Sequence, residues 1–406
     1  MIKELLPGDA AKRMRPAVTR LFPSRSGLAA RLSLLHALTF LSVGVYIPFF
    51  PLWLASRGVS DVAIGVLLTI PIVARVLAAS GAAGLGDGRV PPVLLLAGLN
   101  LAGALFYAAM AAQSDPWVIG LLMALSAMAT AGVIPLADML TTAQVRAGAG
   151  IDYGRVRLWG SVSFFAANLL GGVVIARQGA GIVPMAMAAC FACAALLALA
   201  APSPPRGLSA TPPRGAPRAG FGAAFWWAIA AVACINATHG ALYAFGSLHW
   251  RNLGYSEEAI GGFWAVGVAA EILLFLVAGG IVARGVAGLF WIGVGGGAAV
   301  VRFGVMAVDP GPWTTLALQC LHGLSFGCLH LGAMAVVSAL APDGRRAAAQ
   351  GRLVAVSAFA SAAATLISGP VFQNHGALVF LAMTPLAILG CVFAALAKRN
   401  LPGDTG

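Results

Sequence analysis

The chain has 406 residues, of which 60% are hydrophobic and only 9% are charged, and its mean hydropathy is +0.91. Soluble domains carry about 25% charged residues and disordered chains are poor in apolar ones, so the composition excludes both classes. The remaining class is a protein whose surroundings are lipid.

The first 30 residues are polar and basic, and we interpret residues 1–30 as a cytoplasmic tail. A secretory signal peptide would hold a short apolar stretch and a cleavage site. Instead, the apolar run from Arg31 to Leu54 is long enough to cross a bilayer. An Arg-rich transit peptide is the alternative interpretation of this segment.

Twelve apolar runs follow, each of roughly 20 residues or more, the length needed to cross a hydrocarbon core of about 30 Å. Continuous apolar runs indicate helices, because helices satisfy their own backbone hydrogen bonds in lipid. The sequence therefore predicts an all-α polytopic membrane protein. The expected spans are 31–55, 61–85, 91–112, 116–145, 154–176, 181–200, 222–250, 257–283, 287–308, 313–341, 346–372 and 376–397.

A polar break separates the sixth and seventh spans. The stretch from Pro202 to Gly220 is rich in proline and carries three arginines, so it cannot span and is interpreted as a cytoplasmic linker. It divides the chain into two bundles of six helices. The predicted parts are the tail 1–30, the bundle 31–200, the linker 201–221, the bundle 222–398 and the tail 399–406.

The basic residues indicate the topology of these spans. With the N-terminus inside, 20 of the 25 Lys and Arg residues fall on the inner side and three on the outer side. The positive-inside rule then places both termini in the cytoplasm of a cell whose inner membrane holds the protein. The net charge of +12 follows from topology, so we expect no nucleic-acid partner, and we expect a monomer in the lipid bilayer.

The two halves repeat each other. Residues 58–65 (Gly-Val-Ser-Asp-Val-Ala-Ile-Gly) match residues 254–261 (Gly-Tyr-Ser-Glu-Glu-Ala-Ile-Gly). Duplicated six-helix halves resemble the plan of major facilitator transporters, in which the substrate site lies near the bilayer midplane between the halves.

Three groups of residues are similar to one family within that plan. They are Asp-Tyr-Gly-Arg-Val-Arg-Leu-Trp-Gly-Ser at 152–161, His-Gly-Ala-Leu-Tyr at 239–243 with the stretch 255–271, and the histidine-containing stretch 321–330. Together they resemble the phenylpropionate permease family, which is related to the oligosaccharide/proton symporters typified by lactose permease. The resemblance covers residues 31–398. It implies the twelve-helix major facilitator fold and proton-coupled import of a small aromatic acid such as 3-phenylpropionate by alternating access.

Gating charges are expected near the cytoplasmic ends of the helices. The loop after the second span, shorter here than is usual in the superfamily, keeps Asp87 and Arg89, which we expect to help hold the two halves closed. Asp152, Arg155 and Arg157 open the fifth span and are interpreted as a gating ion-pair group.

Four charges lie inside spans, where a charge costs about 2.5–3.5 kcal/mol and is usually functional. They are Arg75, Asp138, Glu271 and Arg302. Glu271 is interpreted as a carboxyl group that carries a proton across the membrane, or as a structural ion pair with Arg302. Asp138 is interpreted as a second proton site or as the partner of Arg75, which would then be a structural charge.

The resemblance assigns further roles. In lactose permease an acidic residue, an arginine and a histidine in helices eight, nine and ten serve sugar binding and proton coupling. Glu271, Arg302 and His322 match those helices here. The acidic residue one turn after that histidine has no counterpart, because Ser325 stands there. Glu271 or Asp138 would therefore have to carry the proton. Independently, Arg302 could bind a substrate carboxylate through its planar guanidinium, or act as a counter-ion.

Aromatic and histidine stripes follow two later helices. His239 and Tyr243 are one turn apart, and His322 and His330 share a broad face. We interpret them as cavity lining, with Trp264 as an additional aromatic contact for the substrate; packing is the alternative.

No cofactor and no metal is expected. The six cysteines lie in apolar runs, and no set of ligands has metal spacing. The chain has no Walker A loop or nucleophile elbow, so an enzyme is not expected. The alternatives left open are a sugar or nucleoside proton symporter, a drug exporter, and a non-transporting membrane sensor on a transporter fold.

Overall fold

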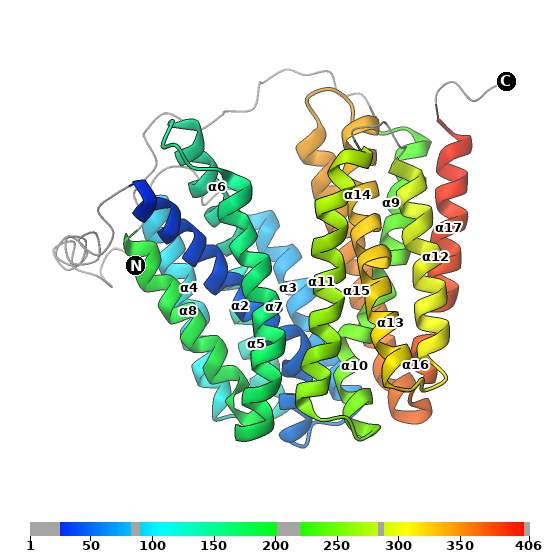
Figure 1. The fold of residues 1–406 in the computed structure, drawn as a ribbon, viewed down its shortest axis with the longest axis horizontal. Coiled ribbons are helices and arrows are strands. Elements are labelled where there is room, and N and C mark those ends of the chain that lie inside the picture. Colours follow the sequence, from blue (N-terminus) through cyan, green and yellow to red (C-terminus); the bar gives the residue numbers. More distant parts are fainter. Residues whose placement is uncertain (1–24, 83–89, 201–219, 283–287, 402–406) are drawn as a thin grey trace. The chain divides into compact units, whose positions relative to one another are not determined.

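The computed structural model describes residues 25–82, 90–200, 220–282 and 288–401 (Figure 1). In these residues, 12 helices are long and apolar enough to cross a membrane, which confirms the predicted all-α polytopic plan. The first six spans are formed by α2 (Arg25–Ser56), α3 (Asp61–Ala82), α4 (Pro92–Ala111), α5 (Pro116–Thr130) with α6 (Val133–Arg146), α7 (Tyr153–Gln178) and α8 (Val183–Ala200).

The last six spans are broken more often than the first six: the seventh, tenth and twelfth each contain more than one α-helix, whereas in the described residues of the first six spans the fourth does so. The last six are α9 (Ala223–Ala237) with α10 (His239–Asn252), α11 (Glu257–Val282), α12 (Gly288–Met306), α13 (Pro312–His322) with η3 (Gly323–Cys328) and α14 (Leu329–Leu340), α15 (Arg346–His375), and α16 (Leu378–Leu381) with α17 (Thr384–Arg399). A short 3-10 turn, η2 (Ala180–Ile182), precedes α8.

The first helix begins earlier than predicted. It starts at Arg25 and not at residue 31, so the last residues assigned to the tail are helical. The physical reason is local, because residues 27–30 (Gly-Leu-Ala-Ala) are mostly good helix formers that continue the apolar run.

Three spans are interrupted in their middle. The fourth breaks between α5 and α6, where Pro135 cannot donate a backbone hydrogen bond to the preceding turn. The seventh breaks at Thr238, whose hydroxyl donates to the carbonyl of Ile235 at 2.6 Å. The tenth contains η3, a π-helical segment, and such segments occur frequently at functional sites.

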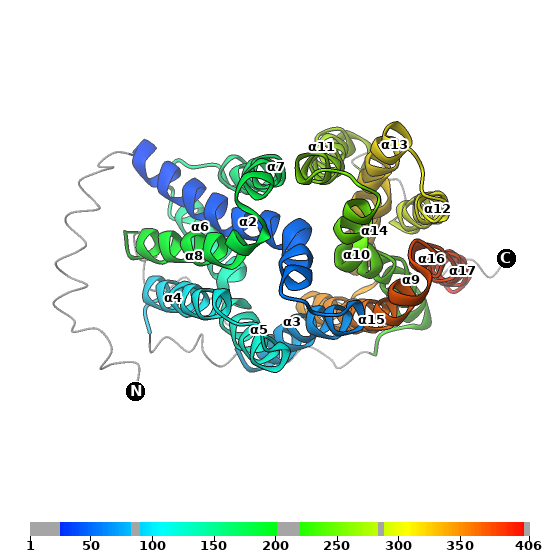
Figure 2. The same cartoon turned by 90° about the horizontal axis from the view of Figure 1, so that it is seen from below.

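The chain forms two compact units. Unit 1 consists of the described parts of residues 1–46, 74–167 and 181–210, and in it α4 packs along α8 and α5. Its core includes Leu35, Leu96, Leu140 and Ala194. Unit 2 consists of residues 47–73, 168–180 and the described parts of 211–406. In unit 2, α9 packs against α15 and α17 (Figure 2).

These units differ from a simple six-plus-six division, because parts of α2, α3 and α7 belong to unit 2. Glycine contacts explain part of this difference. A Cβ atom added at Gly65 would lie 3.1 Å from the Cα atom of Gly369, and one added at Gly172 would lie 3.1 Å from the Cα atom of Glu258. Glycine is needed where two backbones approach so closely.

The internal repeat is visible in the backbone. Gly58 and Gly254 both adopt left-handed φ angles, +77° and +87°, in the turns that precede α3 and α11. Glycine adopts this conformation without the steric cost of a side chain. The repeated sequence therefore encodes the same turn twice.

Candidate functional site

Two groups of polar side chains on the membrane-spanning helices contact one another. The Arg302 cluster comprises His239, Glu271, Arg302, Gln319, His322 and Ser325, all in unit 2. The Asp138 cluster comprises His36, Asp138, Thr141, Tyr153 and Arg157, all in unit 1.

Arg302 is the centre of the first cluster. It lies on α12 with only 1% of its surface exposed. Its Nη2 atom donates to Oε1 of Gln319 at 2.6 Å, and Nη1 bonds Nδ1 of His322 at 2.9 Å and Oγ of Ser325 at 3.5 Å. No described carboxylate lies within ion-pair distance of this guanidinium, so the structure does not contain the alternative ion pair of Arg302 with Glu271. Among the described residues, the charge is held by neutral groups only.

The bond between Arg302 and His322 fixes the state of the histidine. A guanidinium can only donate, so Nδ1 of His322 must accept. His322 is therefore neutral in this arrangement and carries its proton on Nε2. That Nε2 atom lies 4.0 Å from Oε2 of Glu271, too far for a direct hydrogen bond. His322 thus stands between the cation and the carboxyl group and separates them.

The π-helical segment η3 shapes this site. Gly323 packs against the backbone of Ala270 on α11, and a Cβ atom there would lie 2.8 Å from the Ala270 carbonyl oxygen. The segment therefore brings the tenth span close to the helix that carries Glu271. A Cβ atom at Gly327 would lie 3.8 Å from the Cγ atom of Glu271.

Aromatic rings extend from the cluster along the tenth span. Phe326 stacks on His322 with ring centroids 5.4 Å apart, and His330 stacks on Phe326 at 6.4 Å. His330 also meets the edge of Phe275 at 6.1 Å. The three rings form a ladder that leads from the buried Arg302 cluster to the exposed His330.

The seventh span supplies a second aromatic wall. His239 bonds Ser325 from Nε2 at 3.2 Å, and its ring lies 5.5 Å from that of His322 and 5.8 Å from that of Tyr243. Trp264 lies behind Tyr243 at 5.9 Å and is itself buried. Four of the five residues predicted as substrate contacts thus form one connected group. They are Arg302, His239, Tyr243 and Trp264, and His330 lies at the exposed end of the ladder of rings.

Asp138 is the centre of the second cluster, with 32% of its side chain exposed. Tyr153 donates its hydroxyl to Oδ1 at 2.9 Å, and Nε of Arg157 lies 3.8 Å from the same oxygen. The Arg157 guanidinium covers the ring of Phe40 at 3.9 Å. The structure does not contain the alternative pair of Asp138 with Arg75, because Arg157 on α7 occupies that place and Arg75 is exposed on α3.

His36 lies under Asp138 and is almost fully buried. Its Nε2 atom is 3.1 Å from Oγ1 of Thr141 and 4.0 Å from Oδ1 of Asp138. Since Thr141 donates its own proton to the carbonyl of Ala137, Nε2 of His36 must be the donor toward Thr141. Nδ1 of His36 is then a buried acceptor for which the described residues offer no hydrogen bond.

The remaining predicted charges are distributed differently. Asp152 accepts a hydrogen bond from the backbone N–H of Arg155 at 2.7 Å, so these two residues stay at the start of α7 while Arg157 turns to Asp138. The gating residues Asp87 and Arg89 lie outside the described residues. Within the described ranges, no group of three or more His, Cys, Asp or Glu side chains could hold a metal ion.

Sequence reasoning missed several partners. Ser325 and Phe40 were not expected to contact the two arginines, although Phe40 is one helical turn from His36 and so shares its face. It also missed His249, which bonds Asp309 at 3.0 Å; Asp309 has an unusual positive φ of 51°. The two residues are distant in the sequence, so their pairing can be seen only in the three-dimensional structure.

Comparison with known proteins gives consistent matches. Residues 29–382 match the model of the MFS_1 like family. The chain is 30% identical over 371 residues to a protein of Escherichia coli (strain K12) named "Probable 3-phenylpropionic acid transporter", covering 86% of this chain and 92% of that one. It is also 32% identical over 186 residues to the maltose permease of Geobacillus stearothermophilus, which is 45% of this chain and 47% of that one.

Solved structures agree in fold. The nucleoside transporter NupG matches with a TM-score of 0.77 at 18% identity, over 91% of this chain and 99% of that one. A bacterial homologue of the lysosomal transporter Spinster, in an inward-facing and occupied conformation, matches with a TM-score of 0.73 at 18% identity, over 94% and 98%. At this identity the likeness concerns the fold alone.

Proposed function

The chain belongs to the MFS_1 like family, and from this premise we propose that it is a proton symporter that imports a small aromatic carboxylic acid such as 3-phenylpropionate. It has the major facilitator fold of twelve membrane helices and is a multi-pass membrane transporter, not an enzyme. The proposed part is the coupling to protons, the import direction and the identity of the solute.

One observation carries the choice of an acid. Arg302 is a fully buried cation whose described partners, Gln319, His322 and Ser325, are all neutral. A buried charge without a counter-charge is costly, and a planar guanidinium binds carboxylates through two parallel hydrogen bonds. A substrate carboxylate would supply the missing negative charge.

The rings around Arg302 support an aromatic substrate. The ring of His322, which bonds the guanidinium, stacks on Phe326 and meets the edge of His239, and His239 in turn contacts Tyr243. Aromatic pairs prefer stacked or edge-on contacts and gain about 0.5–1.5 kcal/mol from them. A phenyl ring joined by a short chain to a carboxylate suits this combination, and the Escherichia coli relative carries the name of such an acid.

Electrostatics can couple the proton to the acid. His322 lies between Glu271 and Arg302, so the two groups are close, and an ionised Glu271 would repel an anion bound at Arg302. Protonation of Glu271 removes that repulsion, and binding of the proton and of the anion then favour each other. His322 lies between both groups and Asp138 provides a second protonatable site, so these three residues are the proposed proton-coupling groups.

A sugar/proton symporter is the second candidate. The match to maltose permease over 186 residues favours it. Its weakness is Arg302, because a neutral sugar leaves the buried charge uncompensated.

We place the protein in the cell inner membrane with both termini in the cytoplasm, acting as a monomer. The distribution of Lys and Arg supports this orientation.

An uptake assay tests the proposal. Purified protein in liposomes with an imposed pH gradient, acidic outside, should accumulate radiolabelled 3-phenylpropionate or cinnamate, and a protonophore should abolish accumulation. Maltose and a nucleoside serve as comparison solutes. Accumulation of maltose without any uptake of the acids would establish the second candidate, and uptake of acid unaffected by the protonophore would remove the proton from the mechanism.

A further inference from the structure

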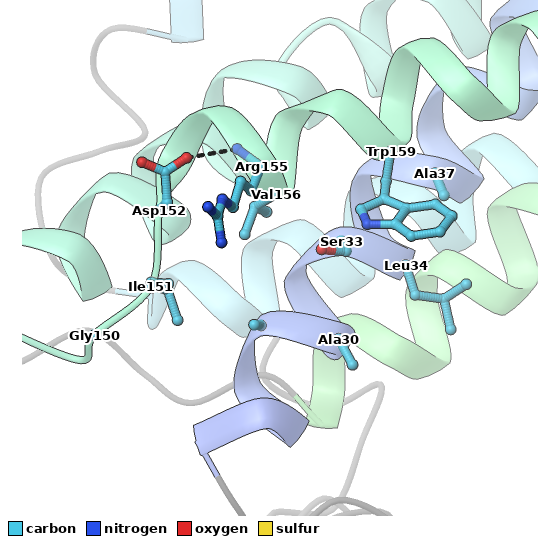
Figure 3. Close-up of a pocket in the computed structure, with 11 residues that line it drawn as sticks. Ala30, Ser33, Leu34, Ala37, Gly150, Ile151, Asp152, Arg155, Val156 and Trp159 are labelled. Atoms are coloured by element: carbon cyan, nitrogen blue, oxygen red, sulfur yellow. Dashed lines mark hydrogen bonds between the residues drawn. The ribbon is translucent and has the colours of Figure 1, made fainter.

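A groove lies at one end of unit 1, on a different side of α7 from the Asp138 cluster. It has a volume of about 680 Å³ and is lined by the first turns of α2, the turn before α7 and the first turns of α7 (Figure 3). All of its lining residues belong to unit 1, so its shape depends on that unit alone.

Arg155 and Arg157 serve opposite faces of α7. Two residues along an α-helix correspond to a rotation of about 200°. Arg157 is committed to Asp138 and Phe40, whereas Arg155 lines the groove together with Trp159, one turn further on the same face. The groove is therefore separate from the cluster proposed to act in transport.

The guanidinium of Arg155 is the single cation among the lining residues. Figure 3 shows it directed into the space between α7 and α2. Asp152 is the single acidic lining residue, and its Oδ1 atom already accepts the backbone N–H of Arg155 at 2.7 Å. No ion pair of the described residues uses the Arg155 side chain. The mouth of the groove thus presents a positive group to a ligand.

The wall beyond Arg155 is apolar and open. Trp159 is 55% exposed and Leu34 is 45% exposed, and Ala30, Ala37 and Val156 continue the surface between them. Trp159 lies about 6 Å along α7 from Arg155, at 1.5 Å per residue. Both helices are long and apolar enough to span a membrane, so we expect the exposed apolar surface between them to meet lipid chains.

From this arrangement we infer that the groove binds a phospholipid of the adjoining leaflet, with its phosphate on Arg155 and an acyl chain along Leu34, Ala37 and Trp159. Guanidinium groups bind phosphate through paired hydrogen bonds, and tryptophan is enriched at the level of lipid headgroups. In the orientation proposed above this is the cytoplasmic leaflet, where basic side chains attract anionic lipids. A free anion without a chain would leave the apolar wall unused.

Native mass spectrometry tests this inference on the full-length protein. The delipidated protein is titrated with dioleoylphosphatidylglycerol, and the occupancy of a retained lipid is compared between variants. Arg155→Ala should weaken retention about fivefold, in line with the contribution of one basic residue near anionic lipid. Trp159→Ala should also weaken retention, because the apolar contact with the acyl chain is lost. Arg155→Lys should retain most of it. Arg146→Ala is the matched control, because Arg146 is an exposed arginine of the neighbouring α6 that does not line the groove.

Equal retention by Arg155→Ala and the native protein, or an equal loss in Arg146→Ala, would overturn the site. Competition separates the possible ligands. Octyl phosphate should displace the lipid and inorganic phosphate should not, because only the former has a chain. Displacement by 3-phenylpropionate would show instead that the groove belongs to the substrate route. Uptake of 3-phenylpropionate tests the proposed function separately, since neither result depends on the other.

Discussion

At the scale of single residues, the important property of Arg302 is that no described carboxylate lies within ion-pair distance of its guanidinium. Its described partners are an amide, a neutral imidazole and a hydroxyl, so the guanidinium keeps its full charge in a buried position. Its Nε atom has no hydrogen-bond partner among the described residues, and the electrostatic cost of such a buried charge would be relieved by an anion. These surroundings support the proposal that Arg302 binds a substrate carboxylate.

Replacing Arg302 by alanine should weaken binding of 3-phenylpropionate by roughly ten- to hundredfold, since hydrogen bonds to charged groups contribute about 1.5–3 kcal/mol. Binding of the neutral 3-phenylpropionamide should change little. Isothermal titration calorimetry of both ligands on both proteins measures the difference. An equal loss for the acid and the amide would show that Arg302 only holds the helices together, and Arg302→Lys distinguishes charge from bidentate geometry.

Glu271→Gln should abolish uphill accumulation driven by a pH gradient while exchange of labelled for unlabelled substrate continues. The amide keeps the size of the side chain and cannot take up or release a proton, so it resembles the protonated carboxyl group permanently. Substrate binding by this variant should lose its dependence on pH, whereas in the native protein binding should weaken as pH rises and Glu271 ionises. Normal uphill uptake by the variant would exclude Glu271 as the proton carrier, and Asp138→Asn would then be the next variant to measure.

The sequence could identify these residues but not their partners. The four intramembrane charges are conspicuous because each stands alone in an apolar run. Which of them meet depends on helix packing: Asp138 meets Arg157 and not Arg75, and Arg302 is separated from Glu271 by His322. The tautomer of His322 follows only from the geometry of its bond with Arg302.

At the scale of elements, close approach of backbones decides where the outer parts of helices belong. Gly261 on α11 contacts the Asn168 carbonyl and the Cα atom of Gly172 on α7, and Gly65 on α3 makes the corresponding contact with Gly369 on α15. The sequence repeat predicts that Gly65 and Gly261 are equivalent. Their partner glycines, Gly172 and Gly369, follow Gly154-Arg155 and Gly351-Arg352 at the same spacing, so the two contacts repeat each other. The repeat does not by itself predict which helices meet. The π-helical segment η3 was likewise invisible, because its residues fit an ordinary helical pattern.

Gly261→Ala should lower thermal stability, because a methyl group there would overlap the backbone of α7, and overpacking typically costs about 1–3 kcal/mol. Gly262→Ala is the control. The two glycines are adjacent in α11, both substitutions raise helix propensity, and a Cβ atom at Gly262 meets nothing within 4 Å. Thermal unfolding followed by intrinsic fluorescence compares them. Equal melting temperatures would mean that α7 and α11 do not depend on this contact.

At the scale of the whole molecule, we attribute the strong basic charge to the orientation of the chain in the membrane. Charged residues are rare in this chain, and in the predicted topology 20 of the 25 basic ones fall on the inner side, so the predicted orientation depends on few residues. The even six-helix division was less informative, because parts of α2, α3 and α7 pack in unit 2. Sequence periodicity reports which residues are helical, whereas packing across helices depends on contacts distant in the chain.

Reporter fusions measure the orientation directly. Green fluorescent protein joined after Arg399 should fluoresce, since it folds only on the cytoplasmic side, and alkaline phosphatase joined after Asn252 should be active, since that end of α10 is expected outside. The fusions test two sites on opposite faces, so a wrong assignment of one helix changes one signal and an inverted protein changes both.

Replacing Arg345, Arg346 and Arg352 by glutamine should reduce the strength of the orientation signal on the inner side without removing it, because the other inner basic residues remain. Inversion caused by these three changes alone would mean that the second half sets its orientation independently of the first.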